Sequence, residues 1–281
     1  MPHPPQAPSA TQGQVVVDGL AIAYRSQGAG PPVLLVHGWP TSSFLWRNVM
    51  PALAAHRRVI AIDLPGFGAS DKPLDVTYDL PFFARILDGF LAALEVDTLG
   101  LVVHDMGGPA ALYWAAEHPE RIERLGILNT LIYPEVSFAV RAFIAAIGVP
   151  GLRGALTSQW GLALALDYGL HDRSRRPADA REGTLAPFRS PEARRALART
   201  AQGITPADLR PIAAWLPTVE VPVQVIYGTR DRILPDMAQT ARRLKEDIPH
   251  AEVTPLEGCG HFLQEERPDE IGRLLADFFA A

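Results

Sequence analysis

Short apolar runs recur along this chain and alternate with longer stretches in which apolar residues repeat at helical spacing. Such runs are typical of buried strands, and their alternation with helices predicts a mostly parallel sheet covered by helices. A hairpin of Gln14–Val17 and Ala21–Tyr24 is expected around the turn dipeptide Asp18-Gly19. Six further strands are expected at Val33–Val36, Val59–Ile62, Leu99–Val103, Leu125–Leu128, Val223–Tyr227 and Glu252–Thr254.

Helical spacing of apolar residues predicts at least five helices between and after these strands. Two of them begin with residues that favour helix N-termini: Asp236 precedes one, and Pro268, Asp269 and Glu270 open another. The five helices are expected at Phe44–Ala55, Leu80–Leu94, Pro109–Glu117, Met237–Glu246 and Pro268–Phe279.

The alternation of strands and helices fails between residues 131 and 215, where the sequence is helical and is broken by Pro and Gly. We therefore expect a main α/β domain of residues 1–130 and 216–281, with an inserted helical cap at 131–215. The charged run at 172–176 is interpreted as a solvated surface loop.

Composition fits one soluble, enzyme-sized unit of 281 residues, of which 48% are hydrophobic. A net charge of -5 argues against nucleic acid or an anionic membrane as partner. The single cysteine, Cys259, cannot form an internal disulfide, and no signal peptide or stretch of 18 apolar residues is visible. A cytoplasmic location is the expectation, and the oligomeric state is left open.

An acidic residue, Asp105, follows the apolar strand Leu99–Val103 at the point where the chain turns into a helix. Gly107 and Gly108 are small enough for a sharp strand-to-helix turn that exposes a reactive side chain at its tip. A carboxylate nucleophile would form an ester with a substrate carbon. This chemistry indicates displacement at an alkyl carbon and argues against acyl transfer.

A base and an orienting acid are available at the ends of later strands. His261 lies in the Gly-rich loop before the final helix, and Asp231 follows the strand Val223–Tyr227. The order nucleophile, acid, base along the chain predicts a triad of Asp105, Asp231 and His261. Asn129, at the end of the preceding strand, cannot carry the acid's charge.

Two backbone amides are expected to form an oxyanion hole at this site. Trp39, in the loop after the strand Val33–Val36, supplies one amide, and Met106, directly after the nucleophile, supplies the other. No cluster of His and Cys typical of a metal site and no dinucleotide or phosphate loop is visible, so no metal or cofactor is expected.

These motifs resemble the Asp-nucleophile branch of the α/β-hydrolase superfamily, which includes haloalkane dehalogenases and epoxide hydrolases. The resemblance covers almost the whole chain and implies an α/β-hydrolase fold with a mostly parallel eight-stranded sheet and a helical cap. The matching segments are 37–48, which begins His37-Gly38-Trp39-Pro40, 63–72, His118-Pro119-Glu120-Arg121 and 260–265.

Dehalogenases of this kind usually hold the departing halide with two side-chain N–H donors. The corresponding main-domain positions are Met106, which has no donor, and Trp39. Trp160 in the cap is a candidate second donor. The segment Thr41–Asn48 is similar to the corresponding segment of haloalkane dehalogenases and favours dehalogenation over epoxide hydrolysis.

Epoxide hydrolysis is the alternative, because its enzymes accept an aromatic residue after His-Gly and varied residues after the nucleophile. That chemistry usually needs two cap tyrosines as acids. Tyr133 and Tyr168 are the candidates. No tyrosine lies between Tyr168 and Tyr227, where the resemblance places the second one.

An esterase or lactonase, and a non-catalytic binding protein on the same fold, are weaker alternatives. The expected substrate is a small, largely apolar organic molecule, with water as co-substrate, because the cap is rich in Leu, Ala, Ile and Phe.

Overall fold

The computed structural model describes residues 9–280 and contains an eight-stranded sheet in the order β1-β2-β4-β3-β5-β6-β7-β8. The hairpin β1–β2 is antiparallel, β2 also pairs antiparallel with β4, and all other neighbours are parallel. This confirms the predicted fold class. The strands are β1 (Thr11–Val17), β2 (Leu20–Gln27), β3 (Pro32–Val36), β4 (Arg58–Ile62), β5 (Leu99–Asp105), β6 (Ile122–Thr130), β7 (Val223–Gly228) and β8 (Glu252–Leu256).

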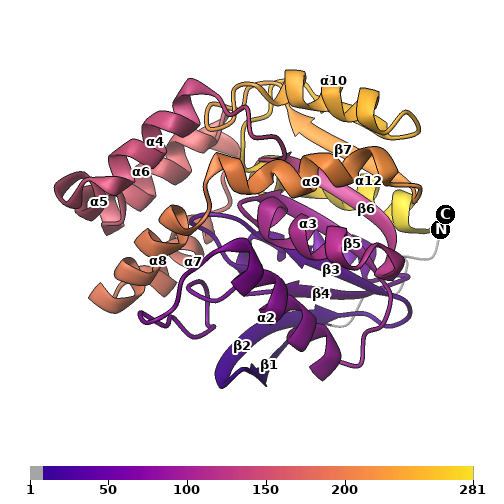
Figure 1. The fold of residues 1–281 in the computed structure, drawn as a ribbon, viewed down its shortest axis with the longest axis horizontal. Helices are drawn as coiled ribbons and strands as arrows, with labels where there is room; N and C mark the ends of the chain where they lie inside the picture. The colour runs from indigo at the N-terminus through magenta and orange to yellow at the C-terminus, as the bar shows by residue number, and fades with distance from the viewer. Residues whose placement is uncertain (1–8, 281) are drawn as a thin grey trace.

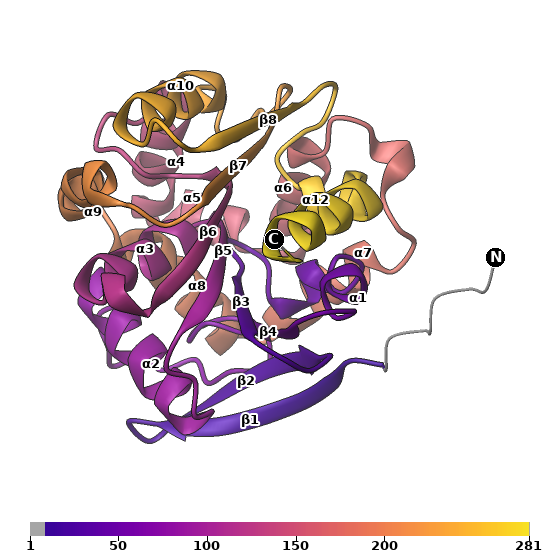
Figure 2. The same cartoon turned by 90° about the vertical axis from the view of Figure 1, so that its right-hand side faces the viewer.

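Helices cover both faces of this sheet (Figures 1 and 2). Alternate residues of β3 show the two sides: Leu34 and Val36 belong to one buried cluster, and Val33 and Leu35 belong to the other. The helices on the first face are α2 (Leu80–Ala93), α3 (Gly107–Glu117), α9 (Arg210–Trp215) and α10 (Met237–Asp247), and those on the second are α1 (Met50–Leu53) and α12 (Pro268–Ala280).

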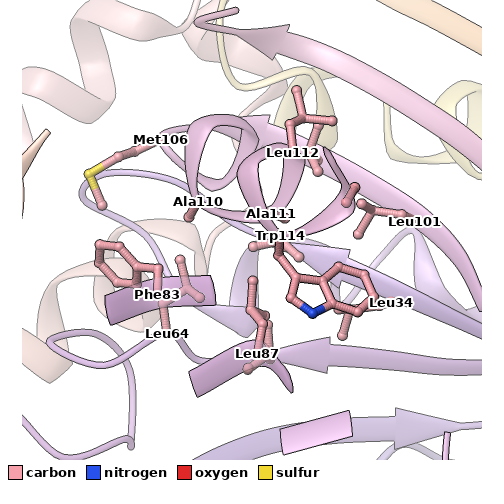
Figure 3. Packing of buried hydrophobic residues seen from close by; sticks show 14 of the residues in the cluster. Leu34, Leu64, Phe83, Leu87, Leu101, Met106, Ala110, Ala111, Leu112 and Trp114 are labelled. Atoms are coloured by element: carbon pink, nitrogen blue, oxygen red, sulfur yellow. The ribbon is translucent and has the colours of Figure 1, made fainter. Parts of the chain in front are cut away.

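Helix α3 lies over the central strands and begins at Gly107, directly after the turn that follows β5. Figure 3 shows Trp114 and Ala111 of α3 among apolar side chains that include Leu34 of β3 and Leu101 of β5. Trp114 is fully buried. Close packing of this helix therefore holds the end of β5 in a fixed position.

The segment between β6 and β7 is helical, and its first five helices lie together beyond one end of the sheet (Figure 1). Helix α9 was expected to belong to this group, but it packs against α3 over the sheet, because its Ile212 is buried in the cluster on that face. The five helices are α4 (Phe138–Gly148), α5 (Pro150–Leu156), α6 (Gln159–Gly169), α7 (Ala180–Leu185) and α8 (Pro191–Gly203).

Within residues 9–280, no single helix has the length and hydrophobicity that crossing a membrane requires. Helices α4 and α5 meet these criteria only when they are taken together, and the chain bends by 111° between them.

The helix expected at Phe44–Ala55 is wrong in its extent. The chain forms a short 3-10 helix, η1 (Ser43–Trp46), and then the separate four-residue helix α1. Pro51 lacks the N–H that would continue a helix from Phe44, whereas the first turn of a new helix needs no such donor. The interruption falls at residues 47–49, and Pro51 lies in the first turn of the new helix.

We predict that Gly107→Ala destabilises the fold, because the added Cβ would collide with the backbone carbonyl of His37 at the turn between β5 and α3. The expected loss in free energy of unfolding is at least about 2 kcal/mol, measured by urea denaturation. Gly148→Ala is the matched control, because nothing lies near its added Cβ in a helix. A change within about 1 kcal/mol is expected there. Equal losses for both variants would contradict this account of the turn.

Candidate active site

Asp105 occupies the tight turn between β5 and α3, where its backbone φ is +51°. Non-glycine residues rarely adopt this left-handed conformation, and where they do it often marks a functional site. Gly38 makes room for the side chain, since a Cβ on Gly38 would collide with the Asp105 carboxylate. Thr130 at the end of β6 donates a hydrogen bond to the Asp105 carbonyl, which further holds the turn.

The structure brings Asp105, His261 and Asp231 together at the C-terminal ends of β5 and β7. His261 Nε2 lies 3.3 Å from Asp105 Oδ2, within ion-pair range, and its Nδ1 lies 2.8 Å from Asp231 Oδ2. All three side chains are buried. The imidazole thus lies between two carboxylates, in the arrangement of a nucleophile, a base and an orienting acid.

Asp231 is fixed by four hydrogen bonds that use both of its oxygens. Oδ1 accepts from the backbone amides of Ile233 and Leu234 at 2.7 and 2.8 Å. Oδ2 accepts from the Asn129 amide at 2.7 Å as well as facing His261. These bonds hold the carboxylate in place beside the imidazole.

Charge interactions set the protonation of the central residues. Burial alone lowers the pKa of His261, but the charges of Asp231 and Asp105 outweigh burial and raise that pKa to about 10. Burial raises the pKa of Asp105, but His261, His104 and the Met106 amide together lower it by more, so the pKa lies below its usual value. The resting site therefore holds an imidazolium between two carboxylates.

Backbone donors face the other oxygen of Asp105. The Trp39 amide donates to Asp105 Oδ1 at 2.6 Å, and a hydrogen bond from the Met106 amide helps to lower the Asp105 pKa. His37 fixes the loop before Trp39, because its Nε2 accepts from the Leu64 amide at 3.1 Å and its Nδ1 lies 3.0 Å from the Gly38 carbonyl. The two amides that sequence analysis paired are thus near the same carboxylate.

A cavity of about 520 Å³ opens above Asp105, between the strand ends and helices α4, α5, α6 and α8. Its walls are largely apolar, as expected for a site that receives a small organic molecule. Trp160 and Tyr168 line it and are 70% and 51% exposed. Trp39 also lines it, but its indole N–H donates to the Leu197 carbonyl at 3.1 Å and is already engaged.

Tyr133 does not belong to the pocket, in contrast to the expectation from sequence. It is absent from the residues that line the cavity, and its hydroxyl donates to Asp247 Oδ2 at 2.7 Å. The Arg243 guanidinium lies over its ring, 3.8 Å from the centroid. Contacts with α10 therefore direct this side chain away from Asp105.

Two residues to which sequence analysis gave no role contact the triad. Asn129 was dismissed for lack of charge, yet its amide bridges Asp231 and the Gly228 backbone. His104 Nε2 lies 3.0 Å from the His261 carbonyl, while burial and the nearby His261 lower the pKa of His104 to about 4. The sequence did hold a signal for both residues: His104 directly precedes the expected nucleophile, and Asn129 lies near the end of a strand.

Within residues 9–280, no three His, Cys, Asp or Glu side chains are grouped so that they could hold a metal ion.

Comparison with known proteins agrees with this geometry. A family model for the alpha/beta hydrolase fold matches residues 31–147. A cis-3-alkyl-4-alkyloxetan-2-one decarboxylase of Shewanella oneidensis is 34% identical, over 90% of this chain and 83% of that protein. Haloalkane dehalogenase 2 of Mycobacterium bovis is 32% identical, over 92% and 91% of the two chains. The crystal structure of a haloalkane dehalogenase from Bradyrhizobium elkani has a TM-score of 0.86 at 27% identity and covers 97% of this chain and 98% of its own. The chain therefore belongs to the α/β-hydrolase family.

Proposed function

We propose that this protein hydrolyses carbon–halogen bonds of small, largely apolar molecules through a covalent ester on Asp105. The observation that carries the proposal is a buried carboxylate nucleophile at the base of an apolar cavity, with His261 Nε2 3.3 Å from it. A carboxylate that attacks saturated carbon gives a stable ester, whereas attack at an acyl carbon would give a mixed anhydride. Similarity to several haloalkane dehalogenases supports the same reaction.

In the first step, Asp105 attacks the carbon that bears the halogen, and the halide leaves with the bonding electron pair. The low pKa of Asp105 keeps it ionised for this attack. Apolar walls exclude water from the reacting carbon, which strengthens the interaction between the carboxylate and its target.

In the second step, water cleaves the ester. Alkylation removes the negative charge of Asp105, so the pKa of His261 falls, and the imidazolium releases its proton to solvent. Neutral His261 then takes a proton from water as hydroxide adds to the ester carbonyl, while Asp231 stabilises the imidazolium that forms. The oxyanion faces the amides of Trp39 and Met106. Its collapse breaks the bond to the alkyl oxygen, which takes the proton from the His261 imidazolium and leaves as the alcohol. The Asp105 carboxyl then passes its proton to His261 and is restored as the carboxylate.

We assign Trp160 as the side-chain donor for the departing halide. Met106 has no N–H in its side chain, and the Trp39 indole is bonded to the Leu197 carbonyl. Trp160 lines the cavity, and within residues 9–280 no protein group accepts a hydrogen bond from its indole N–H. One donor in place of two gives weak stabilisation of the anion, so bromide and iodide should be better leaving groups than chloride.

Helices α4–α8 are proposed to act as the cap over this cavity, since four of them contribute to its lining. The main domain then comprises the sheet and the helices that cover its two faces, with α9 among them.

The epoxide hydrolase alternative is not favoured. It would require phenolic acids at the reacting ring, and Tyr133 is engaged with Asp247 outside the cavity. The similar proteins include haloalkane dehalogenases.

A second candidate is decarboxylation of a four-membered lactone, the activity named for the Shewanella oneidensis relative. The shortage of halide donors around Asp105 favours it, because loss of CO2 from such a ring involves no halide. The products decide between the two reactions: halide and alcohol, or CO2 and alkene.

We predict that His261→Gln traps the ester. Incubation with a short bromoalkane should add the alkyl mass to Asp105, located by intact mass and peptide mapping, because alkylation does not need a base while hydrolysis does. Asp105→Asn is the control and should gain no mass. If His261→Gln releases halide but carries no adduct, the covalent route is wrong.

The two steps should depend differently on pH. Alkylation measured by rapid quench should be nearly constant between about pH 6 and 9, because the pKa of Asp105 lies below its usual value. Ester hydrolysis should rise with pH over this range, because only neutral His261 can accept a proton from water. A hydrolysis rate that falls as pH rises would contradict the role of His261.

Trp160→Phe removes the indole N–H and keeps an aromatic wall. We expect halide release from a bromoalkane to slow by about 10- to 100-fold, since a hydrogen bond to a charged group contributes about 1.5–3 kcal/mol. Tyr168→Phe is the matched control on the same helix and should change the rate by less than about twofold. If the two variants slow halide release equally, Trp160 is not the halide donor.

A further inference from the structure

Glu266 is a buried carboxylate that the steps above do not use. It ends the short helix α11 (Leu263–Glu266), five residues after His261, and is only 4% exposed. Among the described residues it forms no ion pair with a basic side chain. Its charge is satisfied by backbone amides alone: Oε1 accepts from Gly260 at 2.8 Å and His171 at 2.9 Å, and Oε2 accepts from Asp172 at 3.0 Å.

These three amides come from two parts of the chain that are far apart in sequence. Gly260 directly precedes His261, whereas His171 and Asp172 lie in the segment 169–172 that leaves helix α6. The same two segments meet again where the His261 amide donates to the Gly169 carbonyl at 2.7 Å. One carboxylate thus joins the histidine loop to the segment that follows a cavity-lining helix.

The 260–262 loop and the 169–172 segment pack so closely that the glycines between them cannot be replaced by larger residues. A Cβ on Gly260 would collide with the Gly169 carbonyl, and one on Gly169 would collide with the ring of Phe262. In either orientation, a glutamine at position 266 would turn its NH2 group toward at least one of these three amides, donor against donor, and would break up the shared contact. Only a carboxylate accepts from all three amides at once.

We propose that Glu266 is a positioning residue for His261, which it holds in register with helix α6. This inference rests on the proposed function, in which His261 transfers a proton only after the ester has formed. Loss of the contact lets the 260–262 loop shift relative to Asp231 and Asp105, and a shift of this kind affects the water-activating step and spares the initial displacement.

The test is Glu266→Gln, followed through a single turnover with a short bromoalkane by rapid quench and intact mass. The formation rate of the Asp105 ester should stay within about twofold of wild type. Its hydrolysis should slow by at least about tenfold, so that the ester accumulates as it does in His261→Gln. A general weakening of the fold would reduce both steps together.

Glu265→Gln is the matched control. Glu265 is equally buried and adjacent in α11, but its carboxylate pairs with Arg47 Nη1 at 2.7 Å and, among the described residues, bonds to no part of the 260–262 loop. This variant should not accumulate ester. Glu266→Asp, which keeps the charge at shorter reach, should lie between wild type and Glu266→Gln.

A readout independent of activity is hydrogen–deuterium exchange of the amides at 169–172 and 258–262. Both segments should exchange at least about tenfold faster in Glu266→Gln than in wild type, and Glu265→Gln should leave them unchanged. Normal ester hydrolysis together with unchanged exchange would overturn the proposal. Failure of His261→Gln to form any adduct would overturn the dehalogenase function, and the exchange would still decide the role of Glu266.

Discussion

An imidazole held between two carboxylates is the interaction on which the rest of this site depends. His261 lies 2.8 Å from Asp231 and 3.3 Å from Asp105, in surroundings from which solvent is largely excluded. Two adjacent negative charges stabilise the protonated imidazole in these surroundings. Alkylation of Asp105 removes one negative charge and thereby converts the central group from a counter-ion into a base. The order of the two chemical steps follows from this change of charge.

The fold supplies the precision that this cluster needs. Parallel strands bring Asp105 and Asp231 to the same end of the sheet. The Asp105 carboxylate is then held by the Trp39 amide from the loop after β3, and the Asp231 carboxylate by amides of its own loop. His261 is placed differently, because its loop is joined through Glu266 to a segment that follows helix α6. The nucleophile and acid thus depend on the sheet, whereas the base also depends on the helices above it.

Local patterns were sufficient to predict the strands and the acidic turn, and to select three side chains that the structure brings together, Asp105, Asp231 and His261. Apolar runs report burial directly, and Asp105 sits beside the glycines that its turn requires. Side-chain partners were not accessible in this way. Asp247, which removes Tyr133 from the pocket, lies 114 positions along the chain, and Leu197, which occupies the Trp39 indole, lies 158 positions away. Glu266 and Asn129 were missed for the same reason, because their partners come from distant segments.

The most direct test of the covalent route is a single turnover of a bromoalkane in water labelled with ¹⁸O, with enzyme in excess. Hydroxide that adds to the carbonyl carbon of the Asp105 ester leaves the label in the Asp105 carboxylate, and the alcohol carries an unlabelled oxygen that came from the enzyme. Mass spectrometry should therefore find ¹⁸O in the peptide containing Asp105 and ¹⁶O in the alcohol. An alcohol labelled in the first turnover would show that water attacks the substrate directly, and would contradict the account.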